Sequence, residues 1–117
     1  MSRMNREGRK KTQVQWPVMS EALTAHFGER FWMHYASAIA ARTALAEELD
    51  HTVQKQLLRE WWDWNATAGA VDDPRTAIAH LGVELPFEMA IEARQFMNAI
   101  YEEVITRVRA KAPGWKP

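Results

Sequence analysis

The chain of 117 residues contains no cysteine and only five glycines, and these absences exclude several classes of site. Without cysteine there is no disulfide, no thiolate ligand for a metal and no cysteine nucleophile. The glycines are scattered, so the chain has neither a phosphate-binding P-loop nor a Gly-x-Gly-x-x-Gly turn. None of its serines lies in a Gly-x-Ser-x-Gly elbow. The sequence therefore predicts a protein that is not an enzyme, with no cofactor and no small-molecule substrate.

Long hydrophobic runs are also lacking. No stretch of about 18 consecutive apolar residues occurs, so the sequence predicts no membrane span. The basic N-terminus is not followed by the apolar run that a signal peptide requires, because polar residues interrupt the segment 12–27. We expect a cytoplasmic protein that makes no contact with a membrane.

The charges are distributed unevenly although the formal net charge is zero. Residues 1–15 carry five basic side chains and one acidic one. Residues 107–117 carry four basic side chains and no acidic one, whereas residues 16–106 carry six basic and fourteen acidic ones. A neutral total hides an acidic body between two basic ends, which favours contact with a polyanion at the ends only.

Apolar residues recur at helical spacing from residue 17 onward, and no window shows the strict alternation of a strand. The sequence predicts an all-α fold, a small irregular bundle of four or five helices with a basic N-terminal arm. Residues 1–15 have no apolar period, and we expect an arm that only a partner orders. Residues 16–117 are expected to form a single helical domain.

Proline and glycine indicate where most of these helices begin and end. Pro17 suits the first turn of a helix that stops before Gly28. Asp73 suits the N-cap of a short helix that stops before Gly82. Pro86 is expected to open a last helix of about six turns.

The segment 29–67 contains neither glycine nor proline. Asp50 is the one plausible break within it, since aspartate caps helices well, and one continuous helix is the alternative. Apolar residues at intervals of seven indicate one row on this segment, and they are Trp32, Ile39, Ala46 and Val53.

Tryptophan is unusually frequent, with six residues in the chain, and three of them are Trp61, Trp62 and Trp64. On a helix, they and their apolar neighbours span an arc of about 180°, wider than an ordinary core-facing stripe. Such a face belongs either to the centre of the bundle or to a protein interface, where tryptophan is enriched. The acidic residues Glu60 and Asp63 argue against a platform for stacking bases.

The basic ends are the candidate polyanion-binding residues. In the arm they are Arg3, Arg6, Arg9, Lys10 and Lys11, which suit phosphates or an acidic protein, or serve only to keep the chain soluble. Near the C-terminus they are Arg107, Arg109 and Lys111, which also suit the last turn of a helix through its dipole.

Two further motifs are weaker. Glu48 and His51 form a Glu-x-x-His pair, which di-iron bundles use twice, but it occurs once here, so we expect no metal site. The turn Leu81-Gly82-Val83 resembles that of a helix-turn-helix, yet Glu84, Glu88 and Glu92 would present the wrong charge to DNA.

Taken together, these features favour a non-catalytic helical subunit or adaptor of a larger, nucleoprotein assembly. Its basic ends would contact a polyanion, and its tryptophan face would contact a protein or a second copy of the chain. Proteins of this size and class serve as small subunits of CRISPR-type complexes and as phage or plasmid inhibitors of host machines, a comparison of size and class alone. A DNA-binding transcriptional regulator is the alternative.

Overall fold

A computed structural model describes the backbone of residues 3–117 and the side chains of residues 7–117. All regular elements in this part of the chain are helices, which confirms the all-α prediction. There are seven in place of four or five, and they are α1 (Arg3–Gln15), α2 (Pro17–Phe27), α3 (Phe31–His34), α4 (Ala38–Glu48), α5 (His51–Ala66), α6 (Arg75–His80) and α7 (Ala90–Lys111).

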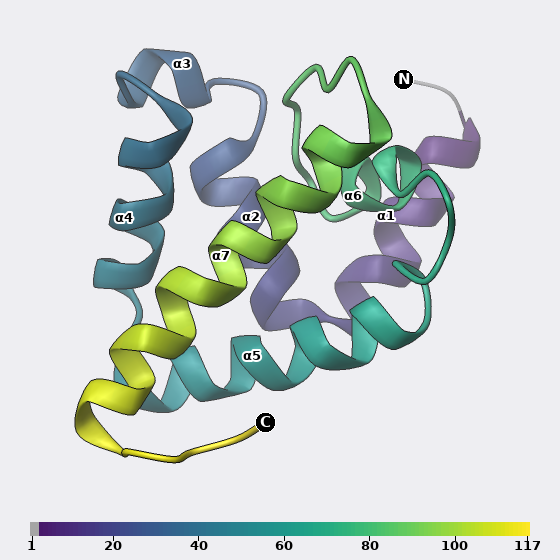
Figure 1. Cartoon of the computed structure of the whole chain (residues 1–117). Coiled ribbons are helices and arrows are strands. Elements are labelled where there is room, and N and C mark those ends of the chain that lie inside the picture. Colours follow the sequence, from purple (N-terminus) through teal and green to yellow (C-terminus); the bar gives the residue numbers. More distant parts are fainter. Residues whose placement is uncertain (1–2) are drawn as a thin grey trace.

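The bundle is built around α5 and α7, which pack against each other. In Figure 1, α7 crosses the front of the molecule diagonally and α5 runs along its lower edge. Helix α2 lies behind them and contacts both α4 and α5, while α4 closes one side against α7. At the opposite side, α1 contacts α2 and α6.

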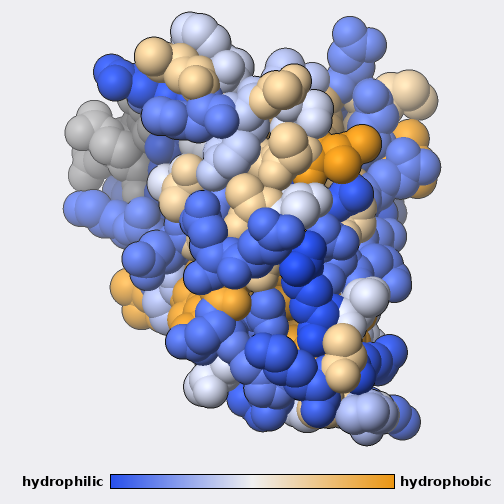
Figure 2. Space-filling view, turned by 90° about the vertical axis from the view of Figure 1, so that its left-hand side faces the viewer, coloured by the Kyte–Doolittle hydropathy of each residue, from blue (hydrophilic) through white to orange (hydrophobic). Residues whose placement is uncertain are grey.

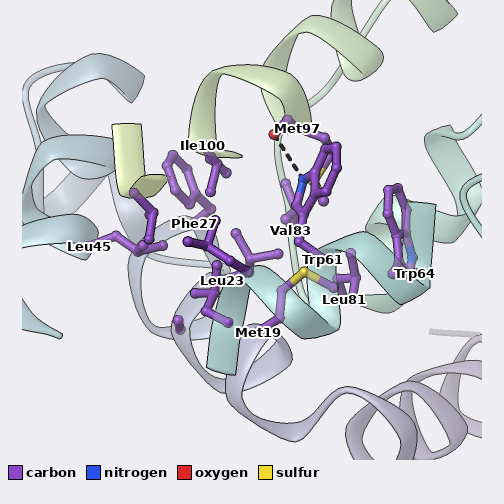
Figure 3. Packing of buried hydrophobic residues seen from close by; sticks show 14 of the residues in the cluster. Met19, Leu23, Phe27, Leu45, Trp61, Trp64, Leu81, Val83, Met97 and Ile100 are labelled. Carbon is purple, nitrogen blue, oxygen red and sulfur yellow. Dashed lines mark hydrogen bonds between the residues drawn. The ribbon is translucent and has the colours of Figure 1, made fainter. Parts of the chain in front are cut away.

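Buried apolar side chains from five helices and the segment after α6 meet in the middle of the bundle (Figure 3). Met19, Leu23 and Phe27 repeat every four residues along α2, so one face of that helix faces the core. The ring of Phe27 meets the edge of Phe96 from α7, with 4.8 Å between ring centroids.

The long segment after α2 breaks at Asp50, as one of the two alternatives predicts. An Asp50 carboxylate oxygen accepts the backbone N–H of Val53 at 2.9 Å and so caps α5. A second break, which was not predicted, precedes Ala38, where the Ser37 hydroxyl accepts the N–H of Ala40 at 3.1 Å. The heptad row assumed one unbroken helix here, and its first two members, Trp32 and Ile39, are exposed.

The predicted arm is a helix in this structure. Helix α1 packs on α2 and α6, and Thr12 is buried at that contact. The sequence showed no apolar period because this contact uses small and polar residues. Gly8 lies so close to the His80 ring that an added Cβ would stand 2.5 Å from it. The Thr12 hydroxyl donates to the Gly8 carbonyl at 2.7 Å.

The end of α6 follows the prediction, whereas the start of α7 does not. Gly82 has φ +96°, a left-handed conformation that glycine adopts without strain. Helix α7 begins at Ala90, four residues after Pro86. The segment from α6 to α7 is held against the body, since the Glu84 N–H donates to the Phe27 carbonyl at 2.8 Å and Val83 is buried in the core. After Pro86, Arg75 donates to the Glu88 carbonyl at 2.8 Å.

Candidate functional site

Helix α1 contacts the bundle through one of its faces. Its contact face is fixed by Gly8 and Thr12, and its end is anchored by Trp16, whose indole N–H donates to Asp63 at 2.8 Å. At 100° per residue, positions 3, 6 and 10 of the chain lie on the opposite side of this helix. One face of α1 therefore packs against the body, and the basic positions 3, 6 and 10 lie on the opposite face.

The five basic residues of α1 do not share one environment. Arg9 forms an ion pair with Glu84 on the segment after α6, which links α1 to the body. Lys10 and Lys11 are exposed, beside a shallow hollow that Val14 also lines. The side chains of Arg3 and Arg6 lie outside the described part of the chain, so their part in the predicted site stays a prediction.

The basic residues near the C-terminus separate into different contacts. Arg107 lies 3.5 Å from Glu47 on α4 and 3.6 Å from Glu103 one turn earlier. The Nε of Arg109 donates to the carbonyl of Trp115 at 3.0 Å. Lys111 is exposed at the last residue of α7, where a cation also favours the helix dipole. Arg107 and Lys111 line the same hollow, and their part in binding a polyanion stays a prediction.

The three neighbouring tryptophans of α5 divide between core and surface. Trp64 is fully buried, and Trp61 is buried with its indole N–H donating to the Met97 carbonyl at 3.1 Å (Figure 3). Trp62 is 57% exposed. The predicted interface of three tryptophans is therefore corrected to Trp62 alone, because Trp61 and Trp64 have no free surface to offer a partner.

The Glu48–His51 motif does not act as a ligand pair in this structure. Helix α4 ends at Glu48 and α5 begins at His51, so the two residues do not share a helical face. The Glu48 carboxylate instead lies 2.7 Å from Nε2 of His26 on α2. In the part of the chain with described side chains, no three potential metal ligands gather.

His26 is the centre of a small buried polar cluster. Its Nδ1 lies 2.8 Å from the Ala22 carbonyl oxygen, and its Nε2 lies 2.7 Å from a Glu48 carboxylate oxygen. The Tyr35 ring stacks on it at a centroid distance of 5.9 Å. Burial, with a smaller contribution from the Glu48 charge, raises the pKa of Tyr35. The cluster joins α2 to the end of α4 and therefore has a structural role.

The helix-turn-helix reading fails on geometry. Helix α6 ends at His80 and α7 begins at Ala90, so residues 81–89 separate them. A helix-turn-helix joins its helices through about three or four residues. The structure therefore gives no support to a regulator that reads DNA through this element.

Sequence reasoning missed two groups of exposed residues. Trp32 and Met33 protrude from α3, a helix too short to show a period. Arg59 and Trp115 come together near the C-terminus, with the guanidinium 5.5 Å from the ring centroid. Only the tertiary structure brings the last pair together, since they are 56 positions apart in the sequence.

Comparisons with known proteins show no relative. The chain matches no protein-family model, and no curated protein or solved structure resembles it significantly. In the described part of the chain, no helix combines the length and apolar character needed to cross a membrane. Any function must therefore be argued from the surface of the molecule itself.

Proposed function

We propose that this protein is a non-catalytic helical adaptor of a nucleoprotein assembly, which binds a polyanion through α1 and a protein partner through the region of α3. The observation that carries the proposal is the orientation of α1. The helix is fastened to the bundle by Gly8, Thr12 and Arg9, and it leaves Lys10 and Lys11 exposed on its other sides.

Charge supports a polyanion at α1. Each phosphate that a lysine or arginine neutralises releases counterions and adds affinity that depends on salt. The body of the protein, residues 16–106, carries eight more acidic than basic side chains, whereas residues 1–15 carry five basic side chains and one acidic one. This difference in charge favours contact between a polyanion and α1.

An adaptor also needs a surface for protein, and the turn from α3 into α4 provides it. Trp32 is 70% exposed, and Met33 and Ile39 are exposed beside it in the sequence. Figure 2 views this side of the molecule, and apolar groups gather in its upper part, at the height of α3 and the start of α4. Exposed tryptophan and methionine are enriched at protein interfaces.

The test of the polyanion contact removes four basic residues of α1 and keeps Arg9, which links the helix to the body. We would change Arg3, Arg6, Lys10 and Lys11 to glutamine, retain Arg9, and measure the anisotropy of a labelled duplex at several salt concentrations. We expect at least tenfold weaker binding and a slope of log affinity against log salt concentration that is shallower by about 3.6, as the loss of four phosphate contacts predicts.

The matched control removes cations from elsewhere on the body, with Arg30 and Arg42 changed to glutamine. Far-ultraviolet circular dichroism should be unchanged in both variants. Equal affinity of the wild-type protein and the α1 variant for the duplex would show that α1 is not the polyanion-binding element.

A further inference from the structure

A second surface on the opposite pair of helices combines aromatic rings with cations. Trp62 of α5 and Tyr101 of α7 lie side by side, with 6.2 Å between ring centroids. The buried Trp61 supports both rings from below, at 4.5 Å from Tyr101 and 6.3 Å from Trp62. The exposed ring of Trp62 and the partly buried ring of Tyr101 are therefore both packed on Trp61.

Cations flank these rings. Lys55, Arg59 and Trp62 follow one another at spacings of four and three, so they share one side of α5. Arg59 lies over the ring of Trp115, and Arg109 of α7 donates to the Trp115 carbonyl. The C-terminal segment after α7 thus fastens an arginine from each of the two helices beside the aromatic pair.

Glu60 and Asp63, the acidic residues that argue against base stacking in the sequence, are both engaged in contacts with other parts of the chain. Glu60 is 6% exposed and accepts the N–H of Met19 at 3.0 Å, where it satisfies the first turn of α2. Asp63 is engaged by the indole of Trp16. Glu102 is the acid that neighbours Tyr101, and its effect on the pKa of Tyr101 is opposed by that of Arg109.

The surface continues one turn further along both helices. Asn65 follows Trp62 by three residues, and Asn98 precedes Tyr101 by three, and both line a hollow together with Arg94. Arg94 donates to the Val71 carbonyl at 2.8 Å, which holds its guanidinium at the rim. Asp72 also lines this hollow. Asparagine amides offer both donors and acceptors to the edge of an unpaired base.

We propose that this α5–α7 surface binds a single-stranded nucleic acid. Bases stack on Trp62 and Tyr101, and backbone phosphates lie against Lys55, Arg59 and Arg109. Aromatic platforms with flanking cations are how proteins bind strands whose bases are unpaired, since a duplex keeps its bases stacked on each other. Three of the six basic residues of the body, Lys55, Arg59 and Arg94, lie on this one surface.

A single strand fits this surface better than a protein does. Lysine is depleted at protein interfaces, whereas Lys55 lies on the same side of α5 as Trp62. The inference deepens the proposed function, because it names the unpaired form of the polyanion, but it uses residues that α1 does not contain. An experiment can therefore contradict the α5–α7 proposal without contradicting the α1 proposal, and the reverse.

The experiment compares tryptophan variants on a labelled oligouridylate, a labelled oligothymidylate and a labelled duplex. Trp62→Ala should weaken single-strand binding about tenfold, as the loss of one stacked base predicts, and leave duplex binding unchanged. Trp62→Phe keeps a ring and should restore most of the affinity. Glu102→Gln removes the neighbouring acid and should tighten binding.

The matched control is Trp32→Ala, which removes a tryptophan that is exposed at the other end of the molecule. Circular dichroism and urea unfolding show that each variant folds. If Trp62→Ala and Trp32→Ala bind the single strands equally well, the inference is overturned, while duplex binding that depends on α1 still supports the proposed function. If the wild-type protein binds no strand and no duplex, both proposals are wrong. Mass measured by light scattering that falls in Trp62→Ala, without strand binding, would assign this surface to a protein contact instead.

Discussion

Residues that are neighbours in the sequence differ sharply in how far they are buried. Trp61 and Trp62 are neighbours, yet one donates a hydrogen bond inside the core and the other is more than half exposed. The cause is the 100° turn between successive residues of a helix, which places adjacent side chains on different sides. A role can therefore be assigned to each tryptophan only by its place on the helix.

The tightest constraint at the scale of one residue is at Gly82. An alanine there would take an unfavourable positive φ, and its Cβ would stand 1.9 Å from the Thr24 hydroxyl oxygen. We expect Gly82→Ala to lower the free energy of unfolding by about 3 kcal/mol, from backbone strain and overpacking together. Urea unfolding followed by circular dichroism measures the change.

Gly114 is the matched control for this substitution, because it also has a positive φ but has no atom within 4 Å of the added Cβ. Gly114→Ala should cost only the backbone strain, about 1 kcal/mol. A loss of the same size in both variants would show that the contact with Thr24 is not tight.

At the scale of elements, hydrogen bonds at helix ends decide where the chain turns. Asp50 satisfies an N–H at the start of α5 that has no partner within the helix. We expect Asp50→Ala to lower the free energy of unfolding by about 1 kcal/mol. Asp50→Asn keeps an acceptor and should restore most of that loss, and Asp72→Ala in the exposed loop serves as the control. An unchanged urea midpoint in Asp50→Ala would mean that packing alone sets this boundary.

At the scale of the whole molecule, partial burial of two tyrosine side chains makes the free energy of unfolding depend on pH in the alkaline range. Burial raises the pKa of Tyr35 and of Tyr101 above the usual value of 10.0, with additions from Glu48 and Glu102. Arg109 opposes the rise at Tyr101. The folded chain therefore keeps its phenol protons to higher pH than the unfolded chain does.

Because the unfolded chain loses its phenol protons at lower pH than the folded chain, alkaline pH destabilises the protein. Below pH 10 both states hold their phenol protons, and the contribution to stability is complete. As the pH rises above 10, the unfolded chain ionises first, so the free energy of unfolding falls until the folded chain ionises too. The double variant Tyr35→Phe and Tyr101→Phe should show a smaller decrease than the wild-type protein in urea unfolding between pH 9 and 11. An equal decrease in both proteins would assign the effect to other groups.

Local pattern alone determined much of this protein. The all-α class follows from apolar spacing, the start of α2 from Pro17 and the end of α6 from Gly82. These features depend on contacts between residues close in the chain, which a sequence displays directly. The uneven charge of the ends and the body is likewise a property of the sequence. Asp50 marked a possible break before α5, and only the structure decided between that break and one continuous helix.

The tertiary structure decided what the sequence could not. Helix α1 is held by the fit of Gly8 against His80 and by Trp16 on Asp63, contacts that span dozens of residues and leave no period in the chain. The segment before α7 is likewise held by a more distant residue, since Arg75 donates to the Glu88 carbonyl at 2.8 Å. The rings of Trp62 and Tyr101 meet only because α5 packs on α7. Contacts between distant residues depend on how the helices pack, and packing is set by the shape of the whole core.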